Sequence, residues 1–257
     1  MSPEWPIILT FHHISDTERS RYVLPSAVLD AQLRTMVADG FTPLPLAEAV
    51  ATGPNGSRTA AEKTFHLTFD DGLASFKTHA LPVLEKLGLL GATTVFVPTA
   101  YVGGSNEWIA RPTPLQRVAP WRDVAEPLMN WDDLAHIRDL GVAVESHGHR
   151  HLPMPDLTYE AALDDVATAK RILGEHGFDA RFIALPFGWR SQLAKRAIQD
   201  AGYEAAFAVK RGGRDALEVR RVPVYGIDSA WMSRFKLSGG YFRWLDAFGL
   251  SGGGSSS

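Results

Sequence analysis

Cysteine is absent from the 257-residue chain. Its absence excludes disulfide bonds, cysteine nucleophiles, thiolate zinc sites and iron–sulfur clusters, so any metal must be held by histidine and carboxylate ligands. A strong charge of either sign is also lacking, because 26 Lys and Arg residues stand against 29 Asp and Glu residues, for a formal net charge of −3. A nearly neutral chain offers no electrostatic footprint for nucleic acid or for an anionic membrane surface.

Long apolar runs are missing as well. The apolar stretches have the length of strands, so we expect no transmembrane segment. Residues 1–6 lack the basic region and apolar core of a signal peptide. We therefore expect a cytoplasmic protein, and export of a processed form stays open as the alternative.

Hydrophobic residues make up 45% of the chain and charged residues 21%, as in ordinary globular proteins. Apolar, β-branched runs alternate with segments of helical period. We expect strands at 7–11, 64–69, 92–97, 142–145, 181–185, 204–209 and 219–225. Helices are expected at 26–40, 77–87, 130–140, 158–173 and 191–202, with N-caps at Ser26, Asn130, Thr158 and Ser191.

This alternation predicts an α/β fold with a parallel sheet and outer helices. About seven units in one domain favour a distorted, incomplete (β/α) barrel of about seven parallel strands, closed or nearly closed. We assign residues 1–250 to this single domain and 251–257 to a flexible Gly/Ser tail. Residues 52–62 are expected to form a surface loop and 102–127 a long loop or lid.

Two adjacent carboxylates, Asp70 and Asp71, follow the strand expected at 64–69. Barrel enzymes place their chemistry at the carboxyl ends of the strands. Adjacent carboxylates repel each other, and the alternative to a functional role is a capped turn, because Asp-Gly is a common turn signal. With a metal ion present, one carboxylate can be a ligand while its neighbour serves as a base.

A pair of histidines, His147 and His151, follows the strand expected at 142–145. Their spacing of four lets both rings reach one ion, whereas the offset of His149 suggests that it points elsewhere. Two histidines and one aspartate leave open positions on a divalent ion, which is typical of a catalytic site. Such a site activates water, and Asp70 would be the general base.

Both clusters resemble motifs of a known family. Thr-Phe-Asp-Asp-Gly at 68–72 and Ser-His-Gly-His-Arg-His at 146–151 are similar to the first two motifs of the polysaccharide deacetylases, carbohydrate esterase family four, which contain the NodB-homology domain. The resemblance implies that Asp70 is the catalytic base. It implies three metal ligands, Asp71, His147 and His151, for zinc or, alternatively, cobalt, nickel or manganese.

The third motif matches only in part. Pro186, within 184–188, corresponds to a family position that helps to form the active-site groove, and we add Phe187 as a substrate-binding residue. Ala184 stands where the family has an arginine that steers the catalytic aspartate, and Arg190 is a nearby substitute. No histidine follows His176, so the family's late general-acid histidine is missing.

His12 is the candidate replacement for that acid. Residues 10–14, Thr-Phe-His-His-Ile, resemble the opening of the bacterial branch that acts on poly-N-acetylglucosamine and related exopolysaccharides. In a closed barrel the first strand neighbours the last, where the missing histidine would lie. The alternative is that His12 or His13 packs structurally at the rim.

Three further residues carry weaker expectations. Trp108 is a candidate substrate-binding residue, because aromatic faces suit pyranose rings, and its alternative is a loop residue that closes over the core. For Arg221, next to Arg220, a surface salt bridge is favoured over a place in the site. Asp228 is a weak candidate for orienting a catalytic group.

Together these residues predict a metal-dependent hydrolase that removes acetyl groups from the N-acetylated sugars of a poly- or oligosaccharide. The alternatives are an O-acetyl esterase or small-amide hydrolase on the same scaffold, and an inactive sugar-binding relative.

Overall fold

The computed structural model describes residues 6–52, 63–110, 125–188, 191–209 and 215–237, together with Tyr241 and Trp244. Seven parallel strands form a closed ring in the order β1, β10, β9, β8, β7, β6, β5. They are β1 (Ile7–Phe11), β10 (Val219–Pro223), β9 (Ala205–Val209), β8 (Phe182–Ala184), β7 (Ala143–Ser146), β6 (Thr93–Val97) and β5 (Thr64–Phe69). Pairing of β1 with β5, from Ile7↔Phe65 to Phe11↔Phe69, closes the ring.

Three short strands complete the sheets. β4 (Thr42–Pro43) adds to β5 outside the ring, and β2 (His13–Ile14) pairs with β3 (Val23–Leu24) just beyond β1. The expected single-domain α/β barrel of about seven parallel strands is therefore confirmed. The boundary at 250 stays a prediction, because the expected tail lies outside the described residues, as do 53–62 and 111–124 of the two expected loops.

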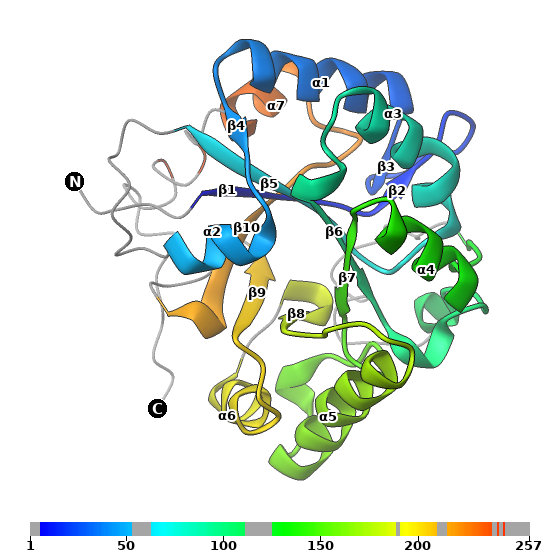
Figure 1. Cartoon of the computed structure of the whole chain (residues 1–257), viewed down its shortest axis with the longest axis vertical. Coiled ribbons are helices and arrows are strands. Elements are labelled where there is room, and N and C mark those ends of the chain that lie inside the picture. The colour runs from blue at the N-terminus through cyan, green and yellow to red at the C-terminus, as the bar shows by residue number, and fades with distance from the viewer. Residues whose placement is uncertain are drawn as a thin grey trace.

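Helices surround the strands (Figure 1). The α-helices are α1 (Ser26–Ala38), α2 (Leu46–Thr52), α3 (Leu81–Lys86), α4 (Trp131–Asp139), α5 (Tyr159–Glu175), α6 (Gln192–Asp200) and α7 (Ala230–Leu237). Short helical turns are η1 (Phe76–Ala80), η2 (Leu90–Ala92), η3 (Thr99–Tyr101), η4 (Glu107–Ala110), η5 (Met154–Asp156), η6 (Pro186–Gly188) and η7 (Ala216–Glu218). The expected helix at 77–87 is thus divided into the π-helical turn η1 and α3.

The strands are almost entirely buried, as expected for a parallel sheet covered by helices. One apolar cluster lies between the strands and α1, α3 and α4, and a second lies under α5 and α6. A third fills the ring itself, where Phe207 packs near Phe96 and Phe182. Leu46 of α2 belongs to this inner cluster together with Ile8 and Val219 near the starts of their strands.

Helix capping follows the sequence at three of four expected positions. Asn130 forms a capping box with Asp133, while Thr158 and Ser191 cap α5 and α6 through their hydroxyl groups. The expectation for Ser26 was wrong, because Pro25 is the N-cap and Ser26 is the first residue of α1.

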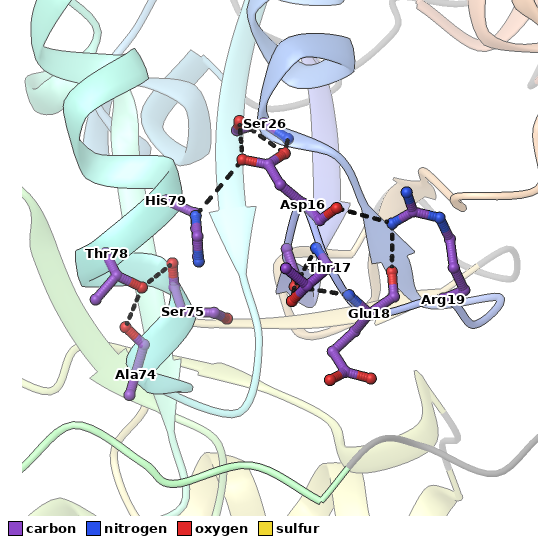
Figure 2. Close-up of polar contacts among 10 residues, drawn as sticks. Asp16, Thr17, Glu18, Arg19, Ser26, Ala74, Ser75, Thr78 and His79 are labelled. Carbon is purple, nitrogen blue, oxygen red and sulfur yellow. Dashed lines mark hydrogen bonds and ion pairs between the residues drawn. The ribbon is translucent and has the colours of Figure 1, made fainter.

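The side chain of Asp16 binds the first residue of α1. Asp16 accepts hydrogen bonds from the Ser26 backbone N–H at 2.9 Å and from the Ser26 hydroxyl at 2.8 Å (Figure 2). His79 of η1 lies 3.8 Å from the same carboxylate. The start of α1 is thus held by a loop residue ten positions earlier, where a negative charge also suits the helix dipole.

Candidate active site

The carboxyl ends of β5 and β7 bring the predicted ligands together. Asp71 follows β5, and His147 and His151 follow β7. One ligand-type atom from each of these three residues lies within 4.8 Å of the other two. Among the described residues, this is the one group of three or more such side chains with that geometry.

The turn after β5 has an unusual backbone. Asp71 adopts a φ of 72° and Gly72 a φ of 67°, both in the left-handed region. Aspartate tolerates that region better than most residues, and glycine is free to enter it. At Gly72 a Cβ would also lie 2.7 Å from the Val97 side chain, so glycine is required for close packing against β6. This turn presents the Asp71 carboxylate to the two histidines.

The two imidazoles point the same type of atom at Asp71. The Nε2 atoms of His147 and His151 lie 3.5 Å and 3.2 Å from Asp71 Oδ1. His147 Nδ1–H donates to the Ala184 carbonyl oxygen at 2.9 Å, which leaves Nε2 as the free lone pair of the neutral ring. A metal-binding histidine is commonly oriented by such a bond to a backbone carbonyl.

The donor set fits a divalent cation. Asp71 Oδ1 is buried and accepts no hydrogen bond, although two imidazole nitrogens face it. Burial alone would raise the pKa of Asp71, but His147 and His151 hold that pKa well below its usual value. Two imidazole nitrogens and one ionised carboxylate oxygen are ligands that zinc and similar ions bind, with positions left open for water or substrate.

Asp70, the adjacent carboxylate, lies in a different environment. It is 3% exposed and makes a bidentate ion pair with Arg221 of β10. Arg221 Nη1 donates to Asp70 Oδ1 at 2.6 Å, and Nη2 donates to Oδ2 at 2.8 Å. The Thr10 hydroxyl donates to Oδ2 at 3.3 Å, and Thr68 accepts a further bond from Arg221 Nη1 at 3.0 Å.

This network keeps Asp70 ionised. Burial acts to raise the pKa of the Asp70 carboxyl, but the Arg221 guanidinium outweighs it, together with His147, and the pKa falls below its usual value. A carboxylate has room for further hydrogen bonds beyond the two that a bidentate arginine uses. Asp70 therefore retains acceptor capacity beside the cation site.

The structure corrects the interpretation of Arg221. A surface salt bridge was favoured, yet Arg221 is completely buried inside the barrel. Val219 occupies the same strand two residues earlier and belongs to the inner apolar cluster. The two-residue period of a strand places Arg221 on that same inward face. Dividing the expected strand at 219–225 into its two faces would have predicted the inward position of Arg221 from the sequence.

His12 approaches Asp70 without touching it. Its Nε2 atom lies 3.9 Å from Asp70 Oδ2, and its side chain is 25% exposed. The ring also lies 5.3 Å from that of Tyr22, between centroids. The neighbouring His13 points elsewhere, with Nε2 2.9 Å from Glu126 Oε2. The acid role of His12 stays a prediction with compatible geometry.

Aromatic side chains surround His151. Trp108 stacks on its ring at a centroid distance of 4.5 Å, and Phe187 meets it edge-on at 5.0 Å. Trp108 is only 5% exposed, so it closes over the site, and a contact with sugar stays a prediction. Pro186 is buried beside Phe187, whose φ of 61° turns the chain after β8.

Other expected residues lie apart from this cluster. His149 Nδ1 bonds with the Thr99 hydroxyl at 2.9 Å, in keeping with its omission from the ligand set. Asp228 accepts from the Tyr225 backbone N–H and from Lys236, in an arrangement that links α7 to the end of β10. Arg190, the suggested substitute for the arginine of the third motif, lies outside the described residues.

Comparison with known proteins agrees with the site and the fold. The sequence model of the family described as polysaccharide deacetylase matches residues 57–206, more than half of the chain. The chain belongs to the polysaccharide deacetylase family. Among curated proteins, it is 23% identical over 211 residues to YxkH of Bacillus subtilis (strain 168), whose name refers to the same family. That match covers 80% of this chain and 64% of YxkH, which is therefore considerably longer.

Solved structures share the barrel. The Streptococcus pyogenes deacetylase PplD, in complex with acetate, has a TM-score of 0.73 at 18% identity, covering 92% of this chain and 99% of PplD. IcaB from Ammonifex degensii has a TM-score of 0.72 at 21% identity, covering 92% of this chain and 97% of IcaB. At these identities the likeness establishes the fold of this polysaccharide deacetylase family member.

In the described part of the chain, no helix has the length and apolar character needed to cross a membrane. The cellular compartment stays a prediction.

Proposed function

We propose that this family member removes acetyl groups from the N-acetylated sugars of a poly- or oligosaccharide, using a divalent cation held by Asp71, His147 and His151. The observation that carries the proposal is the convergence of these three ligands, within 4.8 Å of one another, next to Asp70. Zinc is the first candidate ion, because it commonly binds nitrogen and carboxylate ligands in catalytic sites. Family membership supports the carbohydrate class of the substrate.

When bound, such a cation polarises a carbonyl oxygen and lowers the pKa of water. Asp70 accepts the proton of the attacking water as general base. Its ionised state supports this role, and the two-point contact with Arg221 keeps its oxygens from rotating away. Arg221 thereby supplies the steering function at a site where the third motif has Ala184 in place of the family's arginine.

The departing amine needs a proton as the carbon–nitrogen bond breaks. We assign this proton to His12, whose Nε2 lies 3.9 Å from Asp70 Oδ2 at the partly exposed edge of the site. A substrate nitrogen near both groups would receive this proton from His12 Nε2. Trp108 and Phe187, packed on His151, would exclude water from one side of the acetyl group, and Pro186 would shape the adjoining wall.

The resemblance of 10–14 favours poly-N-acetylglucosamine or a related exopolysaccharide as the polymer. The test is acetate release by zinc-loaded protein from three substrates: N-acetylglucosamine oligomers with β-1,6 linkage, chito-oligosaccharides and acetylated xylan. We expect release from the N-acetylated oligomers. Release from acetylated xylan alone would overturn N-deacetylation in favour of O-acetyl esterase activity.

Two variants in the loop formed by residues 147–151 provide the controls. His147→Ala should lose both the cation and acetate release. His149→Ala lies two positions away and contacts Thr99, so it should retain the cation and most of the activity. A wild-type protein that binds sugar but neither binds a cation nor releases acetate would instead be an inactive relative.

A further inference from the structure

The ligand loop, residues 147–151, carries both candidate histidines at its ends. The buried side chain of Asp165 binds the backbone in the middle of this loop. Asp165 of α5 is completely buried, and the chemistry proposed above leaves it unused. It lies 14 residues beyond the loop in sequence but is in direct contact with it in space.

Asp165 binds two successive backbone amides. Its Oδ2 accepts the N–H of His149 at 2.9 Å, and its Oδ1 accepts the N–H of Arg150 at 3.0 Å. The Arg150 side chain reaches the same Oδ1 with its Nε–H at 3.1 Å. Hydrogen bonds to a charged acceptor are stronger than neutral ones, so these contacts hold the loop backbone firmly.

Gly148 allows this close approach. Its φ is 76°, and a Cβ there would lie 2.9 Å from Asp165 Oδ2. On the other side of the loop, the Gly148 and His149 carbonyl oxygens accept the N–H groups of Thr99 and Ala100 at 3.2 Å and 2.9 Å. The middle of the loop is therefore held between α5 and the end of β6.

The two histidines depend on this support to different degrees. His147 has its own orienting bond to the Ala184 carbonyl. The Nδ1 atom of His151 is buried without a hydrogen-bond partner, and the residue has a φ of 50°. A non-glycine residue remains in that region only when its surroundings impose it. The direction of the His151 ring therefore depends on the loop backbone and on the aromatic side chains around it.

We propose that Asp165 is a positioning residue of the cation site, which sets the affinity for the ion by fixing the loop that presents His151. The inference rests on the proposed cation site. Partners that orient metal ligands typically change affinity or activity by 10–100-fold when they are removed.

The test compares Asp165→Asn with Val166→Ala. Val166 is the next residue of α5 and is equally buried, but its side chain packs in the apolar cluster under α5 and α6. Zinc affinity is measured by competition with a chromophoric chelator, the visible spectrum is recorded with Co²⁺, and thermal stability is measured without metal. We expect Asp165→Asn to bind zinc about 10–100-fold more weakly and to shift the Co²⁺ spectrum. Val166→Ala should lose stability while keeping both signals.

Gly148→Ala serves as a second variant, because its methyl group would push the loop away from Asp165 without removing the charge. It should also weaken zinc binding. It therefore tests the proposal even if Asp165→Asn fails to fold. Zinc binding in Asp165→Asn equal to that in Val166→Ala, or unchanged binding in Gly148→Ala, would overturn the role of Asp165 and leave the proposed function intact. Absence of cation binding in the wild type would overturn both.

Discussion

Asp70 and Asp71 are neighbours in sequence, yet their environments are opposite. Both oxygens of Asp70 are bound by Arg221, whereas Asp71 Oδ1 is buried and accepts no hydrogen bond. Asp70 is thus paired with a guanidinium on both oxygens, whereas Asp71 Oδ1 faces the Nε2 atoms of His147 and His151 at 3.5 Å and 3.2 Å. This contrast fits the two roles proposed above, Asp70 as the general base and Asp71 as a ligand of the cation.

Backbone strain also distinguishes the candidate ligands from Asp70. Of the four non-glycine residues with positive φ in the described part of the chain, Asp71 and His151 are candidate ligands and Phe187 packs on His151. Asp70 is absent from that group. Strained residues persist where the surroundings over-determine them, and they gather at functional sites. Backbone strain is therefore found at two of the three candidate ligands and not at Asp70.

The largest expected effect comes from exchanging each carboxylate for its amide. Asp70→Asn should lower kcat by about 10²–10⁴-fold while cation content stays at the wild-type level, because a base is lost and no ligand is. Asp71→Asn should lose the cation together with the activity, and asparagine tolerates the left-handed backbone at this position. Metal analysis and acetate release measure both effects. Loss of the cation in Asp70→Asn, or its retention in Asp71→Asn, would contradict the assignment of Asp70 as base and Asp71 as ligand.

Removing the charged partner of Asp70 should strongly lower the stability of the protein. Arg221→Met leaves a buried carboxylate without its countercharge, and we expect the free energy of unfolding to fall by about 3–5 kcal/mol. The control is Arg181→Met, which breaks the exposed Arg181–Glu204 pair and should cost less than about 1 kcal/mol. Urea denaturation measures both, and the double variant Asp70→Asn, Arg221→Met should recover much of the loss. Equal effects of the two arginine substitutions would remove the distinction between these pairs.

Cation binding should raise the stability of the protein only when Asp71 is present. At a free zinc concentration 100 times the Kd, the wild type should gain about 2.7 kcal/mol of stability, and a chelator should reverse the gain. Asp71→Asn should gain none under the same conditions. Thermal unfolding with and without zinc provides the measurement. An equal gain in both proteins would mean that the ion binds elsewhere.

The smallest expected effect extends the contrast to a third buried group. His66, inside the barrel, donates from Nδ1 to the Leu44 carbonyl at 2.7 Å and accepts from the Thr94 hydroxyl at 2.9 Å. Burial lowers the pKa of His66 from 6.5 to about 4. The unfolded chain therefore binds this proton first as pH falls, and stability decreases between about pH 6.5 and pH 4.

Between pH 7 and pH 5 the contribution of His66 amounts to about 2 kcal/mol. His66→Gln should remove that part of the pH dependence. Urea denaturation of both proteins at the two pH values isolates it, because the other titrating groups are shared. Identical pH slopes would show that the barrel interior tolerates a charged His66.

Much of the site was predictable because its residues stand at strand ends. Asp71, His147 and His151 follow runs that are apolar enough to be recognised as strands, and parallel strands bring their carboxyl ends to one edge. Arg221 was misjudged because a pair of adjacent arginines is typical of a surface, and its burial depends on the inward face of β10. Ser26 was misjudged for a related reason, since Asp16 reaches it from a separate loop.

From its residue types and their spacing alone, the chain predicts a barrel of alternating strands and helices, a candidate cation site of nitrogen and oxygen ligands, and a neighbouring carboxylate that we propose as the base. Those features depend on local periodicity and on the order of strands. The partner of Asp70, the grip of Asp165 on the ligand loop and the aromatic cover of His151 depend on closure of the ring. Asp70 and Arg221 are 151 positions apart, and no local pattern encodes a contact made across the interior of a barrel.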